Sequence, residues 1–402
     1  MNRIWNQLAI ATNWPVLVAV AVLSAVGVLT IWAHDPADGR KQLVFLAVGV
    51  ICMFALQAVN YLRVGQYAWP FYLVSLLILL YTVLPFSPRT GIGGVPEING
   101  ARAWINFGPI NLQPAELTKI AFCMVLARYL RFRSNYRTVA GLLPPFALAL
   151  APLLLILRQP DLGTALVFIP ALLAMLFVAG ARLSHLLAIV GMGVAVLPLL
   201  WISGRCTLPH YGEHCPVCSN VPVFNRLPQF IKHYQRERVQ AMFSRDPAVL
   251  QKTGFQAERA LIAFGSGRFA GRGPMQLQVG RTVPEAHNDM ILSLIGEQFG
   301  FIGVAVLLAA YLVLFAAGVE IAAATREPFG KLVAVGTVSL LATQTFLNLM
   351  VAVRLVPVTG VTLPFVSYGG SSLLASCIAA GLLLNIGQNR PIVMARDAFE
   401  FD

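Results

Sequence analysis

The sequence is poor in charged residues. Only 11% of its 402 residues are Asp, Glu, Lys or Arg, whereas 57% are hydrophobic. Soluble globular chains carry about 25% charged residues, so this composition excludes an ordinary soluble domain and indicates a membrane protein. Tandem repeats and low-complexity tracts are also missing. We therefore expect a single membrane domain over residues 1–402, with one large loop.

The first apolar run also lacks a cleavage site. Arg3 precedes the run, as in a signal peptide, but its exit at residues 31–33 (IWA) has no small-x-small pattern. The run is as long as a full membrane span. We therefore predict an uncleaved anchor rather than a removed signal.

Long apolar stretches are abundant. A bilayer core about 30 Å thick requires roughly 20 apolar residues per helix. The segments that qualify are 14–33, 43–60, 68–86, 114–130, 138–157, 162–180, 184–203, 289–318, 332–353 and 365–388. The predicted fold is an all-α polytopic membrane protein with ten transmembrane helices. One large extracytoplasmic loop, residues 204–288, separates helices seven and eight.

Lys and Arg in the short loops set the orientation. With the N-terminus inside, eleven lie on the inner side and six on the outer side. This distribution predicts a multi-pass membrane protein with both termini cytoplasmic. The net charge of +12 then reflects topology, and nucleic acid is not an expected partner.

The long loop is basic and partly helical. From Arg205 to Glu285 it holds eleven basic residues against five acidic ones, which suits an anionic ligand or anionic membrane lipids. Residues 235–243 and 254–264 are each typical of an amphipathic helix, and the GSG at 265–267 ends the second. We expect the loop to cover the membrane surface as a lid or platform.

Asp289 is the ionisable residue that we single out first. It follows PEAHN at 284–288 and is predicted in the first turn of the eighth span. A carboxylate there can simply complement the helix dipole. It can also act as a general base, or hold a divalent cation such as Mg²⁺ or Mn²⁺, where a lipid-anchored substrate presents its head group.

Three further charged residues are predicted inside spans, where charge is costly and indicates function. Glu297 lies two turns beyond Asp289 and needs a partner, which we expect in the fourth span. There Glu116 and Lys119, at i and i+3, face the same way. They form either an internal ion pair or, with Arg102, part of a clamp in which Lys119 neutralises a diphosphate.

Other polar groups have plainer interpretations. The segment 363–372 (LPFVSYGGSS), with Ser367, favours close packing at the start of the last span. Asp161 is more typical of a helix cap. Cys206, Cys215 and Cys218 in the loop form either a disulfide with one cysteine left over or, with His210 and His214, a zinc site. Cys52, Cys123 and Cys377 lie in spans and are expected to be inert.

Taken together, the motifs resemble a known family, the shape, elongation, division and sporulation (SEDS) membrane glycosyltransferases, which include RodA and FtsW. The matching segments are 99–105 (NGARAWI), 113–119 (QPAELTK), 159–164 (QPDLGT), 284–289 (PEAHND), 357–360 (PVTG) and 364–372 (PFVSYGGSS). Each alone is weak, but their order spans nearly the whole chain.

The resemblance implies peptidoglycan polymerisation at the bacterial cytoplasmic (inner) membrane. The substrate would be lipid II: a sugar 4-hydroxyl attacks an anomeric carbon and undecaprenyl diphosphate leaves. The family's essential aspartate falls on Asp289, and its cavity residues fall on Arg102, Glu116 and Lys119. We also place Arg281, His287, Glu297 and Ser367 among the substrate-binding residues. The implied partner is a class B penicillin-binding protein, a transpeptidase.

Two departures from the family pattern stand out. A Gln-Lys pair often precedes its Pro-Glu, but here Gln278 is followed by Val279, and Arg281 is the candidate for the missing charge. The cysteine-bearing stretch is not a family feature. The few residues beyond Arg390 favour the elongation (RodA) branch. Two alternative functions remain open: a flippase or transporter of lipid-linked precursors, and a non-enzymatic scaffold.

Overall fold

Apolar helices of membrane-spanning length make up most of the structure. The computed structural model describes residues 13–84, 87–98, 100–108, 111–133, 135–202 and 255–389, together with Arg236, Arg238, Val239 and Met242. Among these residues, seven helices are long and apolar enough to cross a membrane. They are α2 (Trp14–His34), α3 (Pro36–Ala55, continued by η1, Leu56–Ala58), α7 (Val139–Arg158), α8 (Leu162–Ala179), α14 (Ile291–Ala324), α15 (Pro328–Ala352) and α16 (Gly370–Gln388).

The other three predicted spans coincide with helices that are shorter or more polar. α5 (Ala68–Val83) has 16 residues, and the apolar part of α9 (Leu183–Ile202) is Leu183–Val196. α6 (Pro114–Arg131) carries Glu116 and Lys119 inside and two arginines in its last turn. The polytopic helical fold is therefore confirmed, while the count of ten spans stays a prediction.

Several helix ends differ from the predicted ones for local reasons. α3 begins at Pro36 rather than at residue 43, because the Asp35 side chain accepts a hydrogen bond from the Ala37 N–H at 2.7 Å and Pro36 takes the first helical position. α14 extends to Ala324, six residues beyond the predicted end. α16 begins at Gly370 rather than at 365, because residues 363–369 bond to other segments.

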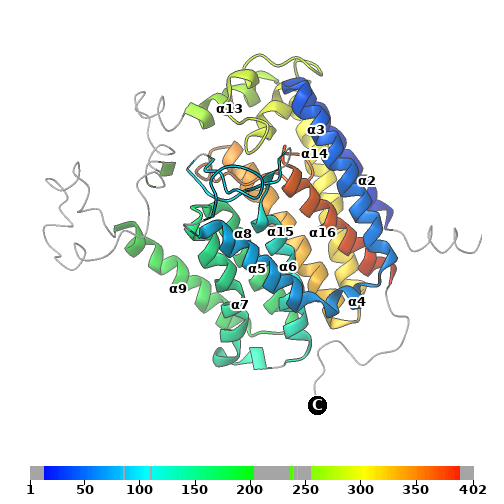
Figure 1. The fold of residues 1–402 in the computed structure, drawn as a ribbon. Helices are drawn as coiled ribbons and strands as arrows, with labels where there is room; N and C mark the ends of the chain where they lie inside the picture. The colour runs from blue at the N-terminus through cyan, green and yellow to red at the C-terminus, as the bar shows by residue number, and fades with distance from the viewer. Residues whose placement is uncertain are drawn as a thin grey trace, which may run out of the picture.

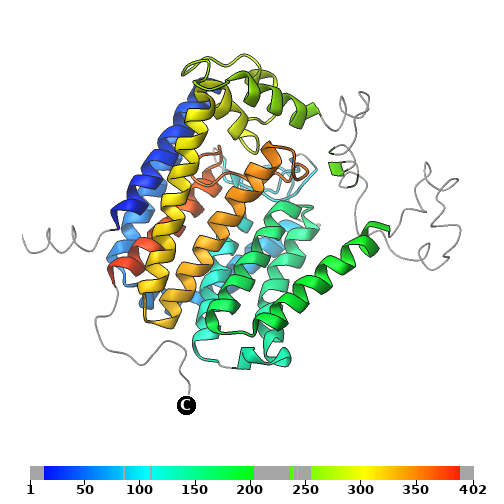
Figure 2. The same cartoon turned by 180° about the vertical axis from the view of Figure 1, so that it is seen from behind.

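α6 and α16 form the interior of the bundle, and most residues of each are buried. α16 packs along α3, α14 along α2, and α15 along both α8 and α6. Small residues permit this: a side chain on Gly49 of α3 would clash with the Cys377 thiol of α16. α9 differs, because it runs away from the other helices in both views (Figures 1 and 2) and leaves side chains such as Leu187 and Met192 exposed.

One end of the bundle carries the irregular segments. α13 (Phe255–Ser266) lies there, whereas α4 (Tyr61–Gln66) lies at the other end (Figure 1). β1 (Ile105–Asn106) and β2 (Asn111–Leu112) form a two-residue antiparallel pair, and β2 lies against α16. α13 confirms the predicted helix at 254–264 and its stop. The predicted helix at 235–243 lies largely outside the described residues.

Candidate active site

Asp289 is a buried carboxylate at the α13 end of the bundle. α14 starts at Ile291 with Met290 as its N-cap, so the predicted first-turn position was wrong by two residues. Among the residues that the structure describes, no side chain caps this helix start, and Asp289 is 8% exposed. Its backbone carbonyl accepts a hydrogen bond from Nδ2 of Asn348 on α15 at 2.9 Å. Asp289 is thus held by neighbouring elements and does not cap α14.

The surroundings of Asp289 make it more basic than an ordinary aspartate. Burial raises its pKa to about 6, and the nearby Glu285 carboxylate acts in the same direction. The Arg238 guanidinium opposes the rise, as does a hydrogen bond of 3.2 Å from Nε2 of Gln256 on α13 to Oδ1 of Asp289. A carboxylate with this pKa is ionised near neutral pH and still accepts a proton readily, as a general base requires.

Hydrogen bonds connect the residues just before Asp289 to the segment that precedes α16. The Ser367 hydroxyl donates to the Asn288 carbonyl at 2.5 Å and accepts from the Leu363 N–H at 2.8 Å. The Tyr368 N–H donates to the His287 carbonyl at 2.9 Å. The predicted close-packing role of residues 363–372 is therefore visible in these bonds. Whether Ser367 also binds substrate stays a prediction.

The His287 side chain lies between two other rings. Its centroid is 5.3 Å from that of His34 at the end of α2 and 5.2 Å from that of Tyr368, which meets it edge-on. The rings connect α2 to the segment just before Asp289 and to the segment that precedes α16. His287, predicted to bind substrate, is thus close to Asp289 in the chain and half-buried beside it.

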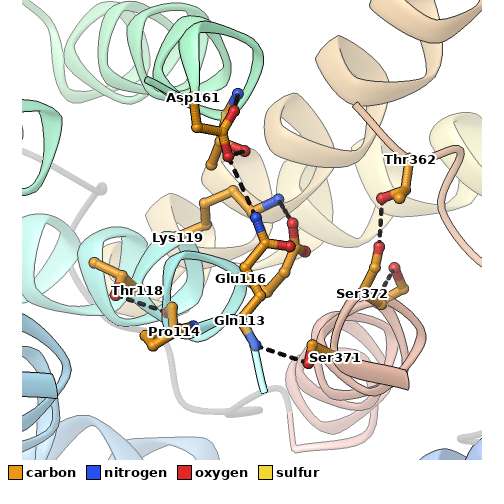
Figure 3. A network of polar contacts seen from close by, with 11 residues as sticks. Gln113, Pro114, Glu116, Thr118, Lys119, Asp161, Thr362, Ser371 and Ser372 are labelled. Atoms are coloured by element: carbon orange, nitrogen blue, oxygen red, sulfur yellow. Dashed lines mark hydrogen bonds and ion pairs between the residues drawn. The ribbon is translucent and has the colours of Figure 1, made fainter. Parts of the chain in front are cut away.

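Glu116 and Lys119 form the buried ion pair that their spacing predicts. Nζ of Lys119 is 2.8 Å from Oε1 of Glu116, and the side chains are 4% and 6% exposed (Figure 3). Both lie near the start of α6, in the interior of the bundle. Two opposite charges at this spacing lower each other's cost of burial.

A polar network surrounds this pair and joins three helix starts. Gln113 donates through Nε2 to Oδ2 of Asp161 at 3.3 Å and through its backbone N–H to the Ser371 hydroxyl at 2.9 Å (Figure 3). Asp161 accepts from the Thr164 N–H at 2.9 Å, which confirms it as the N-cap of α8. The starts of α6, α8 and α16 therefore converge on the Glu116–Lys119 pair.

Arg102 is oriented by a different segment. Its Nη2 donates to the Ser87 hydroxyl at 2.6 Å and to the Ser87 carbonyl at 3.2 Å. Its Nε atom is buried and has no partner among the described residues. No described contact joins Arg102 to Lys119, so the diphosphate clamp that would use both stays a prediction.

Glu297 finds its partner where the sequence analysis did not place it. Its carboxylate accepts three consecutive backbone N–H groups, from Gln278 and Val279 at 2.9 Å and from Gly280 at 2.6 Å. The Arg272 guanidinium lies 3.9 Å away. The expectation of a partner in the fourth span was wrong. The loop before α14 folds back on the helix and its bare N–H groups satisfy the fully buried acid.

A kink in α14 provides a second attachment for this loop. Gly300 has φ 61° and ψ −158°, which interrupts the helical hydrogen bonds. The released carbonyls of Glu297 and Gln298 accept the N–H groups of Arg272 and Gly273 at 2.9 and 3.0 Å. Gly271 lies so close to Gln298 that a side chain there would collide with its carbonyl. Residues 267–283 are thus fixed to α14, which places Arg281 on an exposed turn, η6 (Gly280–Thr282).

Replacing Glu297 should loosen this attachment. A Glu297→Gln amide oxygen accepts fewer of the three N–H groups, and its own N–H groups would face them. We expect a loss of about 2–4 kcal/mol in local stability. Limited proteolysis at residues 268–283 should quicken, while Glu320→Gln on the exposed face of α14 should change nothing. Unchanged cleavage in Glu297→Gln would contradict the anchoring role.

The loop cysteines could not be placed. Cys206, Cys215 and Cys218 lie outside the described residues, so their disulfide or zinc state stays a prediction. The three predicted inert cysteines are free thiols in α3, α6 and α16.

Three residues that contact or face Asp289 were missed. They are Gln256, Asn348 and Arg238. Asn348 carried a usable signal, because a buried amide inside a span needs a hydrogen-bond partner. Its Nδ2 also donates to the Val361 carbonyl at 2.8 Å. The other two come from the long loop, where sequence spacing says nothing about which side chain reaches the bundle.

Comparison with known proteins decides the family. The family described as "Cell cycle protein", which covers FtsW, RodA and SpoVE, matches residues 4–391. The chain belongs to this family. The predicted SEDS membership is therefore confirmed, and the chain is an integral protein of the bacterial inner membrane.

Curated relatives in the FtsW/RodA/SpoVE family align over most of both chains. "Probable peptidoglycan glycosyltransferase FtsW" of Geobacter metallireducens is 35% identical over 390 residues, covering 92% of this chain and 93% of that protein. "Stage V sporulation protein E" of Bacillus subtilis is 32% identical over 380 residues, covering 92% and 94%.

Solved structures agree with this membership. The chain matches one from "Structural coordination of polymerization and crosslinking by a peptidoglycan synthase complex" with TM-score 0.74 and 32% identity, covering 95% of this chain and 99% of that one. Thermus thermophilus RodA matches with TM-score 0.66 and 30% identity, covering 94% and 97%. The similar proteins carry names from several branches, so the elongation branch stays a prediction.

Proposed function

We propose that this chain polymerises lipid II into glycan strands, with Asp289 as the general base. The chain is an enzyme, a peptidoglycan glycosyltransferase, the activity that its FtsW relatives are named for. The observation that supports the assignment of Asp289 is its burial next to Gln256 and Asn348, with a raised pKa. The bound sugar's 4-hydroxyl gives its proton to Asp289 and attacks the anomeric carbon of a second lipid II. The bond from that carbon to undecaprenyl diphosphate then breaks.

The remaining charged residues suit the leaving group. The departing diphosphate carries negative charge that Lys119 and Arg102 can neutralise. Both have N–H donors available for a ligand. Lys119 has three donors and gives one to Glu116, and Arg102 has a buried Nε without a described partner. His287, Arg281 and Ser367 are proposed to contact the substrate around Asp289.

We propose ten spans, with α13 outside the cytoplasm and both termini inside. The helix ends support this arrangement. Asn13, before α2, lies against Gly387 near the end of α16, so the first and last helices have neighbouring ends. Asp289 lies at the other end, where His34 closes α2. A class B penicillin-binding protein is the proposed partner, supported by the match to a chain of a complex that couples polymerisation and crosslinking.

Holding a divalent cation, Mg²⁺ or Mn²⁺, is the alternative role for Asp289. No three His, Cys, Asp or Glu side chains gather into a metal site among the described residues. A cation at Asp289 would therefore have one protein carboxylate and would complete its shell with water and diphosphate oxygens, as Mg²⁺ commonly does. It would neutralise the leaving group.

If Asp289 holds a divalent cation, removing divalent cations should lower polymerisation without unfolding the protein. With substrate oxygens in the shell, the cation is held weakly and chelation by EDTA should be reversible. We expect activity to fall roughly tenfold or more and to return with Mg²⁺ or Mn²⁺. The melting temperature should not change. Full activity in excess EDTA would exclude the cation.

Acidification should switch the enzyme off around the pKa of Asp289. Burial raises that pKa to about 6, so the base is ionised above this pH and protonated below it. We expect kcat/KM to fall about tenfold per pH unit below the pKa. A raised carboxyl pKa favours the protonated folded protein, so this group does not destabilise the fold on acidification. A melting temperature that does not fall while activity falls would separate titration from unfolding.

Purified protein in liposomes with labelled lipid II provides the test of function. We expect glycan polymer and released undecaprenyl diphosphate when the transpeptidase partner is present. Movement of lipid II across the bilayer without polymer would instead identify a flippase. Absence of both polymer formation and lipid II movement would favour the scaffold.

A further inference from the structure

Gln256 connects the loop helix α13 to the catalytic carboxylate. Its Nε2 lies 3.2 Å from Oδ1 of Asp289 and 3.0 Å from the carbonyl oxygen of Pro284. Both partners are oxygens that only accept at neutral pH. The nitrogen of the amide must therefore face them, which fixes how the side chain is turned.

The position of Gln256 follows from how α13 packs. Gln256, Ala260, Ala263 and Gly267 are spaced by four, three and four residues, so they share one face. Ala260, Ala263 and Gly267 are buried, and a side chain on Gly267 would collide with the Gly296 carbonyl of α14. Close docking of this face on α14 is what brings the Gln256 amide to Asp289.

We infer that Gln256 is a positioning residue, which holds Oδ1 of Asp289 and so presents Oδ2 to the attacking hydroxyl. This inference rests on the proposed function, in which Asp289 is the base. One N–H of Gln256 occupies Oδ1, and the other, on Pro284, prevents the amide from turning away. Asn348 holds the backbone of the same residue. Side chain and backbone are thus fixed by separate elements, α13 and α15.

Fixing the carboxylate should act on the chemical step. A carboxylate free to rotate presents the correct oxygen for only part of the time, and proton transfer depends on alignment within hydrogen-bond reach. Lipid II binding depends on groups elsewhere, such as Lys119. Loss of the Gln256 hydrogen bond should therefore lower kcat and leave KM nearly unchanged.

Two substitutions separate this role from packing. Gln256→Met keeps the length and shape but has no donor, whereas Gln256→His changes the shape and keeps an N–H of similar reach. We expect Gln256→Met to lower kcat about tenfold with KM within about twofold. Gln256→His should recover kcat to within about threefold of the parent protein. Gln276→Met, an exposed glutamine of the same loop, is the matched control.

The ranking of Gln256→Met and Gln256→His by kcat decides between positioning and packing. If Gln256 only packs α13 onto the bundle, Met should be tolerated better than His, and that order would overturn the inference. Gln256→Glu, which replaces the donor by an acceptor, is the second variant if Met lowers the yield of folded protein. It should lose at least as much kcat, and parental kcat would overturn the inference.

Failure of this inference is distinct from failure of the proposed function. Parental kcat in Gln256→Met beside an inactive Asp289→Asn would refute the positioning role and leave Asp289 as the base. Full polymerisation by Asp289→Asn would refute both.

Discussion

Asp289→Asn is expected to abolish glycan polymerisation by the purified protein. Asparagine keeps the size of the side chain, and its oxygen can still accept from Gln256, so the fold should persist. The amide cannot take a proton from the sugar hydroxyl at neutral pH. Loss of a positioned general base lowers rates by about a hundredfold to ten-thousandfold. Polymer length and released undecaprenyl diphosphate, measured with labelled lipid II in liposomes, provide the readout.

The neighbouring carboxylate Glu285 supplies the control. It is exposed and accepts from Nδ2 of Asn288 at 2.5 Å. Glu285→Gln removes the same charge four residues away and should keep most of the activity. Comparable losses in the two variants would indicate a general charge effect around the loop and contradict the assignment of Asp289.

Asp289→Asn also separates the role of a general base from that of a cation ligand. If Asp289 only holds a divalent cation, raising Mg²⁺ should restore part of the activity of Asp289→Asn by mass action. If Asp289 takes the proton, excess Mg²⁺ should restore none. The cation titration therefore states which chemical role the carboxylate has.

Apolar run length and local spacing were sufficient to predict the helices and the buried ion pair. Apolar length determines where a chain can cross a bilayer, so the predicted spans coincide with helices. The i,i+3 spacing of Glu116 and Lys119 predicted their ion pair, because it depends only on helix geometry. Asp161 was recognised as a cap by the same kind of local rule.

Contacts between distant segments could not be predicted in this way. The partner of Glu297 is a row of backbone N–H groups at 278–280, and backbone groups leave no trace in side-chain patterns. The kink at Gly300 also depends on carbonyls and N–H groups of the loop that replace the lost helical bonds. Gln256 reaches Asp289 only because α13 docks on α14. These features arise from tertiary packing.

The buried pair Glu116–Lys119 leaves a question that the spacing alone could not answer: whether the charges serve the fold or the reaction. Lys119→Met should destabilise the protein by about 3–5 kcal/mol, because it strands the Glu116 charge in the interior. Glu116→Gln/Lys119→Met removes both charges and should regain most of that stability. Thermal unfolding in detergent measures both effects.

Polymerisation by the same two variants then separates the roles. If the pair only stabilises the bundle, the double variant should regain activity together with melting temperature. If Lys119 neutralises the departing diphosphate, the double variant should be as stable as the parent and still lose roughly a hundredfold in rate. Glu116→Gln alone keeps the cation and should retain more activity than Lys119→Met or the double variant. We expect the double variant to keep its stability and lose its activity, because Lys119 has further N–H donors available beyond the bond to Glu116.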